Sequence, residues 1–177
     1  MKKYFCIILL LSVTSLSFAQ DIIINGKKEN RLLTWSDFKG QPDYNISHDA
    51  LTYWNINYGL KNIALKGDTI KIGSFSVTLS FDETGSWIKA QKQTDKLLKH
   101  EQGHFDIGLI CQREIIKALN NTVFFKDNFQ EKINTVFSSL LDKYHQLSQQ
   151  YDNETEHSRN QESQDNWNAF FAKELNR

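Results

Sequence analysis

The stretch Leu97-Leu98-Lys99-His100-Glu101-Gln102-Gly103-His104-Phe105-Asp106-Ile107 lies in the middle of the chain and largely decides how it folds. It contains the pattern HExxH, in which two histidines stand four residues apart and a glutamate follows the first. Apolar residues recur at helical spacing, which predicts an α-helix from about Trp87 to Leu119 in one or two pieces. On a helix both imidazoles lie one turn apart on one face with the carboxylate beside them, as in a hydrolytic zinc site.

Helical geometry places the motif on the buried face of this helix. At about 100° per residue, with His100 at zero, His104 lies at about 40° and Glu101 at about 100°. The apolar residues Leu97 and Ile115 both lie at about 60°, so the motif faces the predicted core. An inward-facing motif favours a metal site, although two buried and hydrogen-bonded histidines would share the same face.

The rest of the chain predicts an α+β fold. Before residue 86 the sequence is rich in Ile, Val, Thr and aromatic residues, which is typical of strands, and Lys66-Gly67-Asp68 predicts a hairpin turn. The predicted strands are residues 21–25, 50–58, 63–65, 69–72 and 75–81. Ser86 is expected to cap the first helix. Two further helices are predicted at about 128–150 and 158–175, so an N-terminal antiparallel sheet of short strands should pack against about three C-terminal helices, the first carrying HExxH.

The N-terminus predicts export. Lys2 and Lys3 precede an apolar stretch, and Ser17-Phe18-Ala19 supplies the small residues of a cleavage site, so residues 1–19 are interpreted as a signal peptide. The apolar stretch is shorter than the roughly 20 residues of a membrane span. We therefore expect residues 20–177 to form a single metallohydrolase domain, periplasmic or secreted, without stable membrane insertion after cleavage.

Composition narrows the function further. Removal of the two lysines in the signal leaves 19 basic and 21 acidic side chains, a balance that argues against nucleic-acid binding. Cys111 is the only cysteine left after cleavage, so an intrachain disulfide is excluded. The fold must be held by its core and by any bound metal. No pattern indicates the oligomeric state.

The third metal ligand is expected outside the HExxH stretch. Cys111 lies about 10 Å from His104 along the helix axis, whereas zinc ligands sit about 2.0–2.3 Å from the metal. His157 lies in a polar break between the second and third predicted helices, where the chain could bend back over the first. We favour His157 as the third ligand, with Glu154 or Glu156 as the alternative.

Some conspicuous residues are interpreted as structural. His48 precedes a strand with no evident partner and reads as a loop residue. Trp35 and Phe38 flank Asp37, a pattern typical of a packed corner in which the carboxylate accepts hydrogen bonds from backbone amides. We therefore assign no chemistry to these four residues.

Several stretches match, in the same order, a family of bacterial sequences. They are residues 33–40, 86–89, 97–107, 151–155, His157 and 164–167. On these residues the chain resembles a family of exported bacterial domains of unknown function described as predicted secreted zinc-dependent proteases, with zincin-like HExxH sites. One departure is Ser158, where the family usually has glycine, and it bears on the local turn more than on the ligand.

The resemblance implies that His100, His104 and His157 bind Zn2+ and that Glu101 acts on the metal-bound water. The expected function is a secreted or periplasmic zinc-dependent metallopeptidase that hydrolyses peptide bonds. Three protein ligands would leave one position open for water, whose pKa falls toward about 7. Tyr151 is a candidate donor to the oxyanion, and closure of the apolar stripe of its helix is its alternative role.

A second class of function stays open at this point. An exported binding or assembly domain could use the metal only as structure, and a closed site with four protein ligands would favour it. In either case the expected partner is a peptide or protein, and the sequence does not indicate which one.

Overall fold

The chain folds into a sheet followed by a layer of helices, and the computed structural model describes residues 19–176. The predicted signal peptide therefore lies outside the described residues, apart from Ala19. In chain order the elements are β1 (Ala19–Ile24), β2 (Lys27–Lys28), the 3-10 helix η1 (Trp35–Asp37), β3 (Ala50–Leu51), β4 (Trp54–Lys66), β5 (Thr69–Phe81), β6 (Trp87–Ile88), α1 (Asp95–Asn120), β7 (Phe124–Phe125), α2 (Phe129–Thr155) and α3 (Gln161–Leu175).

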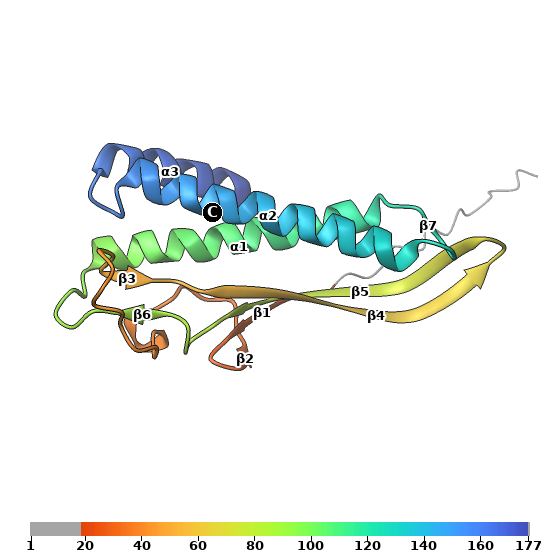
Figure 1. Cartoon of the computed structure of the whole chain (residues 1–177), viewed down its shortest axis with the longest axis horizontal. Coiled ribbons are helices and arrows are strands. Elements are labelled where there is room, and N and C mark those ends of the chain that lie inside the picture. The colour runs from red at the N-terminus through yellow and green to blue at the C-terminus, as the bar shows by residue number, and fades with distance from the viewer. Residues whose placement is uncertain (1–18, 177) are drawn as a thin grey trace, which may run out of the picture.

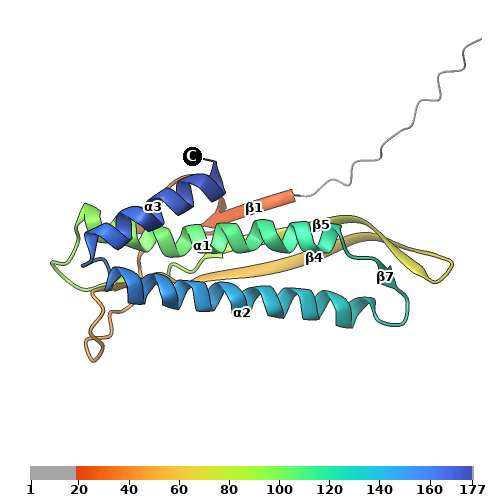
Figure 2. The same cartoon turned by 90° about the horizontal axis from the view of Figure 1, so that it is seen from above.

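Helix α1 is the centre of the structure. It lies between the sheet on one side and helices α2 and α3 on the other, as Figures 1 and 2 show together. Every residue from His100 to Gln112 is buried. A helix that is enclosed on all sides belongs to the core of the protein, so the HExxH stretch is an interior feature.

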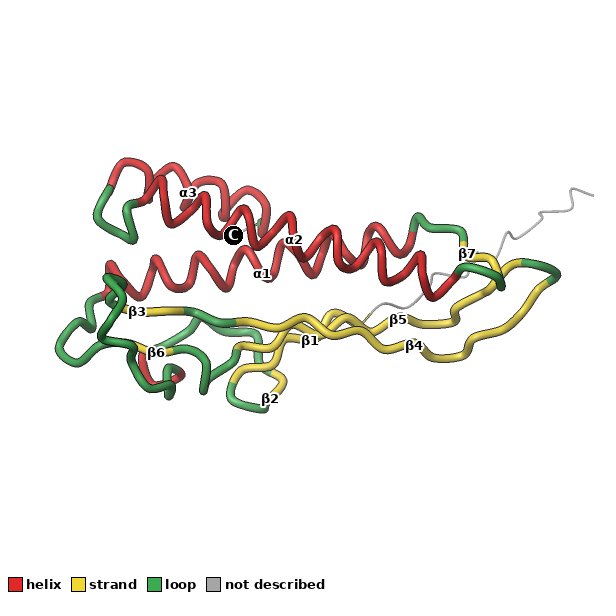
Figure 3. The backbone as a smooth tube through the Cα atoms, viewed as in Figure 1, coloured by secondary structure: helices red, strands yellow, loops and turns green. Residues whose placement is uncertain are grey.

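The sheet is built around a long hairpin. Strands β4 and β5 are antiparallel over 13 residues each, and the turn between Lys66 and Thr69 contains Gly67 at a positive φ of 62°. The strand order is β2-β1-β5-β4, with β7 also paired to β5. In Figure 3 this hairpin, in yellow, extends beyond the end of the helices. The predicted α+β class and hairpin turn are confirmed.

Two details of the sheet differ from the sequence-based expectation. The four strands predicted between residues 50 and 81 are in fact β3 and two long strands, and β1 runs parallel to β5 with Ala19 opposite Ser76. The remaining described strand pairs are antiparallel. The parallel pair was not predictable because the partners are more than 50 residues apart, and a strand's own periodicity does not specify its partner's direction.

The inner face of β5 packs against α1. Phe75, Val77, Leu79 and Phe81 alternate along the strand and are all buried, as the period of two predicts. Gly108 allows this close approach: a Cβ atom there would lie 3.0 Å from both the Leu79 and the Trp54 side chains.

The first helix begins later than the periodicity predicts, because β6 pairs with β3 ahead of it. Thr94 caps α1, and its hydroxyl oxygen accepts a hydrogen bond from the Leu97 backbone N–H at 3.1 Å. The prediction that Ser86 caps this helix is wrong. Ser86 is buried, and its Oγ accepts a hydrogen bond from the Tyr53 backbone N–H at 2.8 Å.

The two later helices are confirmed, with α2 extending to Thr155 and α3 beginning at Gln161. The break between them contains His157, as expected. Among the described helices, none combines the length and the apolar character that a membrane span requires. Cys111 is a buried free thiol, and burial raises its pKa to about 12.

The predicted corner at η1 is confirmed. The Asp37 carboxylate accepts hydrogen bonds from the Thr34 backbone N–H at 2.7 Å and from two nitrogens of Arg31 at 2.8 Å each. Burial raises the pKa of Asp37, but the hydrogen bonds from Arg31 and Thr34 outweigh it and bring the pKa to about 2. The corner is joined to α1, because Gln102 Oε1 accepts a hydrogen bond from the Leu33 backbone N–H at 2.8 Å.

Candidate metal site

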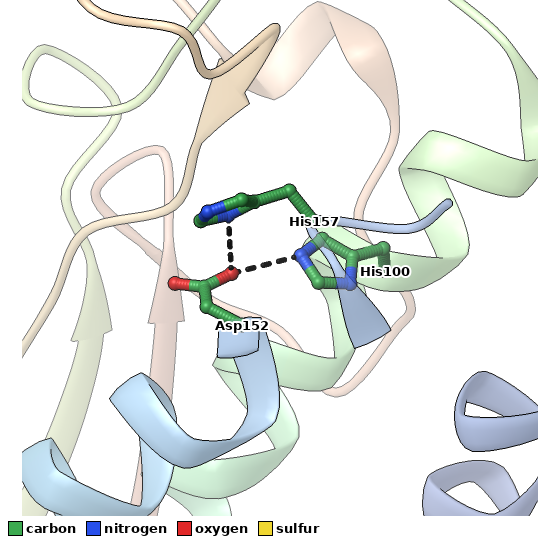
Figure 4. A group of neighbouring side chains, drawn as sticks. All are labelled: His100, Asp152 and His157. Carbon is green, nitrogen blue, oxygen red and sulfur yellow. Dashed lines mark hydrogen bonds and ion pairs between the residues drawn. The ribbon is translucent and has the colours of Figure 1, made fainter. Parts of the chain in front are cut away.

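Three imidazoles converge on one carboxylate oxygen near the N-terminal end of α1. His100 Nε2, His104 Nε2 and His157 Nδ1 each lie 3.1 Å from Asp152 Oδ1. Among the described residues, His100, Asp152 and His157 form a group whose possible ligand atoms all lie within 4.8 Å of one another. Figure 4 shows these three side chains pointing toward one another from α1, the end of α2 and the turn that follows it.

The electrostatics of the cluster keep Asp152 ionised. Burial raises the pKa of its carboxyl group, but the contacts with the His100 and His104 imidazoles outweigh that effect and hold the pKa well below its usual range. Burial lowers the pKa of His104, yet its hydrogen bond to Asp152 and the charge of that carboxylate raise it above the ordinary value overall. The cluster is therefore an anionic oxygen surrounded by imidazole nitrogens, which is a donor set suited to a divalent cation.

The second nitrogens of the two helical imidazoles are also engaged. His104 Nδ1 lies 2.7 Å from the Ser148 hydroxyl on α2, and His100 Nδ1 contacts Gln164 on α3. Metal-binding histidines are usually held in this way, with the nitrogen that does not face the metal bonded to a polar neighbour. Both Nε2 atoms consequently face the cluster.

An unusual turn positions His157. Glu156, His157 and Ser158 all have positive φ, at 50°, 52° and 74°. The turn is closed by hydrogen bonds from the His157 N–H to the Asp152 carbonyl at 3.0 Å and from the Asn160 N–H to the Thr155 carbonyl at 2.8 Å. Ser158 thus occupies a left-handed position that favours glycine, which is the residue the resembled family usually has there.

Glu101 stands beside the cluster without joining it. It is 3% exposed, and its Oε2 accepts a hydrogen bond from the Thr52 hydroxyl at 2.7 Å. Glu101, His100, His104, Asp152 and His157 line one cavity of about 20 Å³. That volume accommodates roughly one water molecule, so a carboxylate and space for a water lie next to the imidazoles.

His48 is a member of the site that the sequence did not reveal. Its ring lies on that of His157, with centroids 4.1 Å apart, and it lines the same cavity. Burial lowers the pKa of His48, and the charge of His157 adds to that effect. His48 lies in a loop, as predicted, but the expectation that it has no partner is wrong, because the turn after α2 brings His157 against it.

Tyr151 does not occupy the position predicted for an oxyanion donor. It is fully buried, and its hydroxyl group donates to the His100 backbone carbonyl at 3.1 Å while accepting from Gln164 Nε2 at 2.7 Å. Burial raises the pKa of the Tyr151 hydroxyl group above its ordinary value. The hydroxyl hydrogen of Tyr151 is already used in a buried hydrogen bond, so it is not available to a substrate. The Tyr151 ring instead packs on His100, with ring centroids 4.6 Å apart, and supports it.

The alternative ligands Glu154 and Glu156 are not brought into the cluster. Glu154 accepts hydrogen bonds from Trp167 Nε1 and Gln150 Nε2, both at 2.7 Å, and Glu156 is exposed. The acid that does reach the histidines is Asp152, which lies in the stretch 151–155 that resembles the family and had no predicted role. Its position five residues before His157 was the only available signal.

These features define a class: an α+β domain with a candidate His/Asp metal site on a central, buried HExxH helix. The chain belongs to the family of bacterial proteins of unknown function DUF922, whose sequence profile matches residues 21–158. Comparisons with curated proteins and with solved structures gave no match. The matched region contains the three histidines and Asp152, and it ends before α3 begins.

Proposed function

We propose that this protein is an exported, zinc-dependent metallopeptidase that hydrolyses peptide bonds. The convergence of three imidazole nitrogens on Asp152 Oδ1, with Glu101 beside them, carries the proposal. His100, His104 and His157 would hold the ion, and Glu101 would act as the general base.

The donor set fits a zinc ion. Ligands of a tetrahedral zinc with bonds of about 2.0–2.2 Å are roughly 3.4 Å apart, close to the 3.1 Å that separates each imidazole nitrogen from Asp152 Oδ1. The ligand atoms of His100, Asp152 and His157 all lie within 4.8 Å of one another, whereas His104 is outside this group and would have to move closer to join a common ion. Imidazole nitrogen with carboxylate oxygen is a combination that zinc accepts. When bound, zinc would polarise the substrate carbonyl and lower the pKa of a water molecule toward about 7.

Glu101 has the placement of a proton acceptor. The Thr52 hydroxyl group donates to Oε2 and fixes the carboxylate, and Glu101 lines a cavity with room for one water. Glu101 would take a proton from that water as it attacks, and would then deliver the proton to the leaving amine. Because Tyr151 is committed to the His100 carbonyl, it plays no part in this step.

The test begins with the metal content of the purified protein. We expect about one zinc per chain, lost in His100→Ala and in His157→Ala and retained in the control His145→Ala, since His145 is exposed on α2 outside the cluster. Peptide-library cleavage, read by mass spectrometry, should then show turnover. Glu101→Gln should keep the zinc and lose at least about 100-fold in rate, the usual range for a general base. A fully active Glu101→Gln protein would rule out the assigned role.

A second function is favoured by one observation. Asp152 Oδ1 stands where a fourth ligand would, so the three histidines and Asp152 together could close the coordination sphere. A closed site is structural and would make the protein an exported binding or assembly domain. The small cavity agrees with this alternative.

Cobalt substitution separates the two functions. In a catalytic site, acetohydroxamate should bind the ion and shift the visible absorption of the Co2+ protein, whereas a closed site should leave the spectrum unchanged.

Export is tested separately, from the N-terminus of the protein that cells produce. Protein recovered from the periplasm or the medium should begin near Gln20, and a chain that retains Lys2 and Lys3 would contradict the predicted signal peptide.

A further inference from the structure

Helix α3 contributes one side chain to the candidate metal site, although it lies beyond the region that the family profile matches. Gln164 is 1% exposed, and its Oε1 lies 3.1 Å from His100 Nδ1. A buried amide at that distance can either accept a hydrogen bond from the imidazole or donate one to it. The choice matters because it decides which nitrogen of His100 carries hydrogen.

The orientation of the amide follows from a backbone carbonyl. The His100 carbonyl oxygen can only accept, so the Tyr151 hydroxyl group must donate to it at 3.1 Å. The phenol oxygen has no second proton, so the group 2.7 Å away on Gln164 must be its NH2. The carbonyl of the same amide then faces His100 Nδ1, which must carry the hydrogen.

Two further contacts agree with this orientation. Gln164 Nε2 also lies 3.2 Å from Asn168 Oδ1, an acceptor suited to the second amide proton. The Thr155 hydroxyl donates to the Tyr151 carbonyl at 2.6 Å, so its oxygen, 3.5 Å from His100 Nδ1, can only accept from the imidazole. Both neighbours of His100 Nδ1 are thus acceptors.

We infer that Gln164 is a positioning residue that holds His100 with its proton on Nδ1, so that the lone pair of Nε2 faces Asp152 and His157. The inference rests on the proposed metal site. In the neutral imidazole, a proton on Nδ1 leaves Nε2 with a lone pair. That lone pair and an ionised carboxylate 3.1 Å apart repel each other, and a cation bound to both relieves the repulsion. Gln164 therefore prepares His100 for a metal ion, and α3 is part of the site.

The rest of α3 keeps this amide in place. Trp167 Nε1 donates to Glu154 Oε2 at 2.7 Å, which fastens α3 to α2, and the Tyr151 ring packs on Trp167 and Phe171 with centroids 5.1 and 5.5 Å away. A buried amide with its partners on both ends fixed has little freedom to flip.

The first part of the test reads the proton directly. In metal-free protein labelled with 15N-histidine, at a pH where the imidazole is neutral, the His100 shifts should report the Nδ1–H form in the wild type. Gln164→Met keeps the size of the side chain, removes the amide, and should shift His100 toward a mixture of both forms. Wild-type His100 with its proton on Nε2 would overturn the inference.

The second part measures zinc affinity by competition with a chelator. Gln164→Met should bind zinc about 10–100-fold more weakly, the range seen when a partner of a metal-binding histidine is lost. Gln164→Glu, which keeps an acceptor opposite Nδ1, should stay closer to the wild type, and the exposed control Gln161→Met should equal it. Wild-type affinity in Gln164→Met would refute the positioning role. Absence of zinc binding in the wild type would instead refute the proposed function, while the 15N measurement would still test the inference.

Discussion

The two halves of α1 are equally buried and differ in what they bury. The first half, up to Asp106, buries mainly polar side chains, and the second half buries mainly apolar ones. The first half buries His100, Glu101, Gln102, His104 and Asp106 beside the apolar Leu97 and Phe105, and the second half buries Ile107, Leu109, Ile110, Ile115 and Leu119 beside the polar Gln112. Burial by itself therefore does not set the character of a residue on this helix.

The difference teaches which half stabilises the fold. A fully buried Ile or Leu side chain contributes about 1.5–3 kcal/mol, whereas a buried polar group returns at best a small net gain after its desolvation. The polar half needs partners from other elements, such as Asp152, Ser148 and Gln164. Burying these polar groups costs desolvation free energy with little gain in stability, which indicates that they are present for function.

The largest expected effect on stability is in the apolar half. Ile115 is fully buried, so Ile115→Ala should lower the free energy of unfolding by about 3 kcal/mol, within the 2–5 kcal/mol seen for such cavities. Chemical denaturation measures the loss. The folded variant should still take up zinc, because the cavity lies more than two turns from the HExxH residues. Loss of zinc at intact fold would show that the halves are not separate.

A matched pair of glycines compares the halves directly. At Gly103 a Cβ atom would lie 2.4 Å from the Tyr151 hydroxyl oxygen, whereas at Gly108 its nearest neighbours would be the Leu79 and Trp54 side chains at 3.0 Å. Gly103→Ala should cost about 1–2 kcal/mol, since overpacking outweighs the better helix propensity. It should also weaken zinc binding by displacing Tyr151 from His100. Gly108→Ala should leave zinc affinity unchanged, and equal effects of both variants on zinc would contradict the comparison.

The corner that holds the polar half should show a pH signature. Asp37 has a folded pKa of about 2 against an ordinary value of 3.8, so its contribution is present above about pH 4 and is lost as the pH falls toward 2. Arg31 is 37% exposed, which screens the pair, so we expect roughly 1–2 kcal/mol. The stability difference between wild type and Asp37→Asn, measured in urea, should shrink between pH 4 and pH 2. A difference that is constant over that range would exclude the ion pair as its source.

The smallest expected effect is a gain. Ser158 has φ of 74°, a conformation that costs a side-chain-bearing residue about 1–2 kcal/mol, while glycine adds unfolded-state entropy of about 0.4–1 kcal/mol. Ser158→Gly should therefore stabilise the protein by about 0.5–1 kcal/mol without altering zinc affinity. Ser163→Gly, inside α3, is the control and should destabilise it. A destabilised Ser158→Gly protein would mean that the turn is not strained.

Much of the fold could be predicted from local patterns. The alternation of Phe75 to Phe81, the turn at Gly67 and the three helices were all recovered, because each is a periodicity or a turn preference within a few residues. The start of α1 was misplaced because Trp87 and Ile88 form a strand only through pairing with the distant β3. The local sequence of a short apolar segment does not indicate which distant segment it will pair with.

For the candidate site, the sequence alone determined that His100 and His104 share a helix face with Glu101 beside them, since residues three and four apart on a helix are neighbours on its surface. It also indicated His157 at a break between helices. Only the tertiary structure decided that Asp152 joins them, that Tyr151 is committed to the core and that Gln164 holds His100. These contacts link residues 52, 51 and 64 positions apart. They exist because α2 and α3 pack on α1, and helix packing depends on the whole core, not on any one segment.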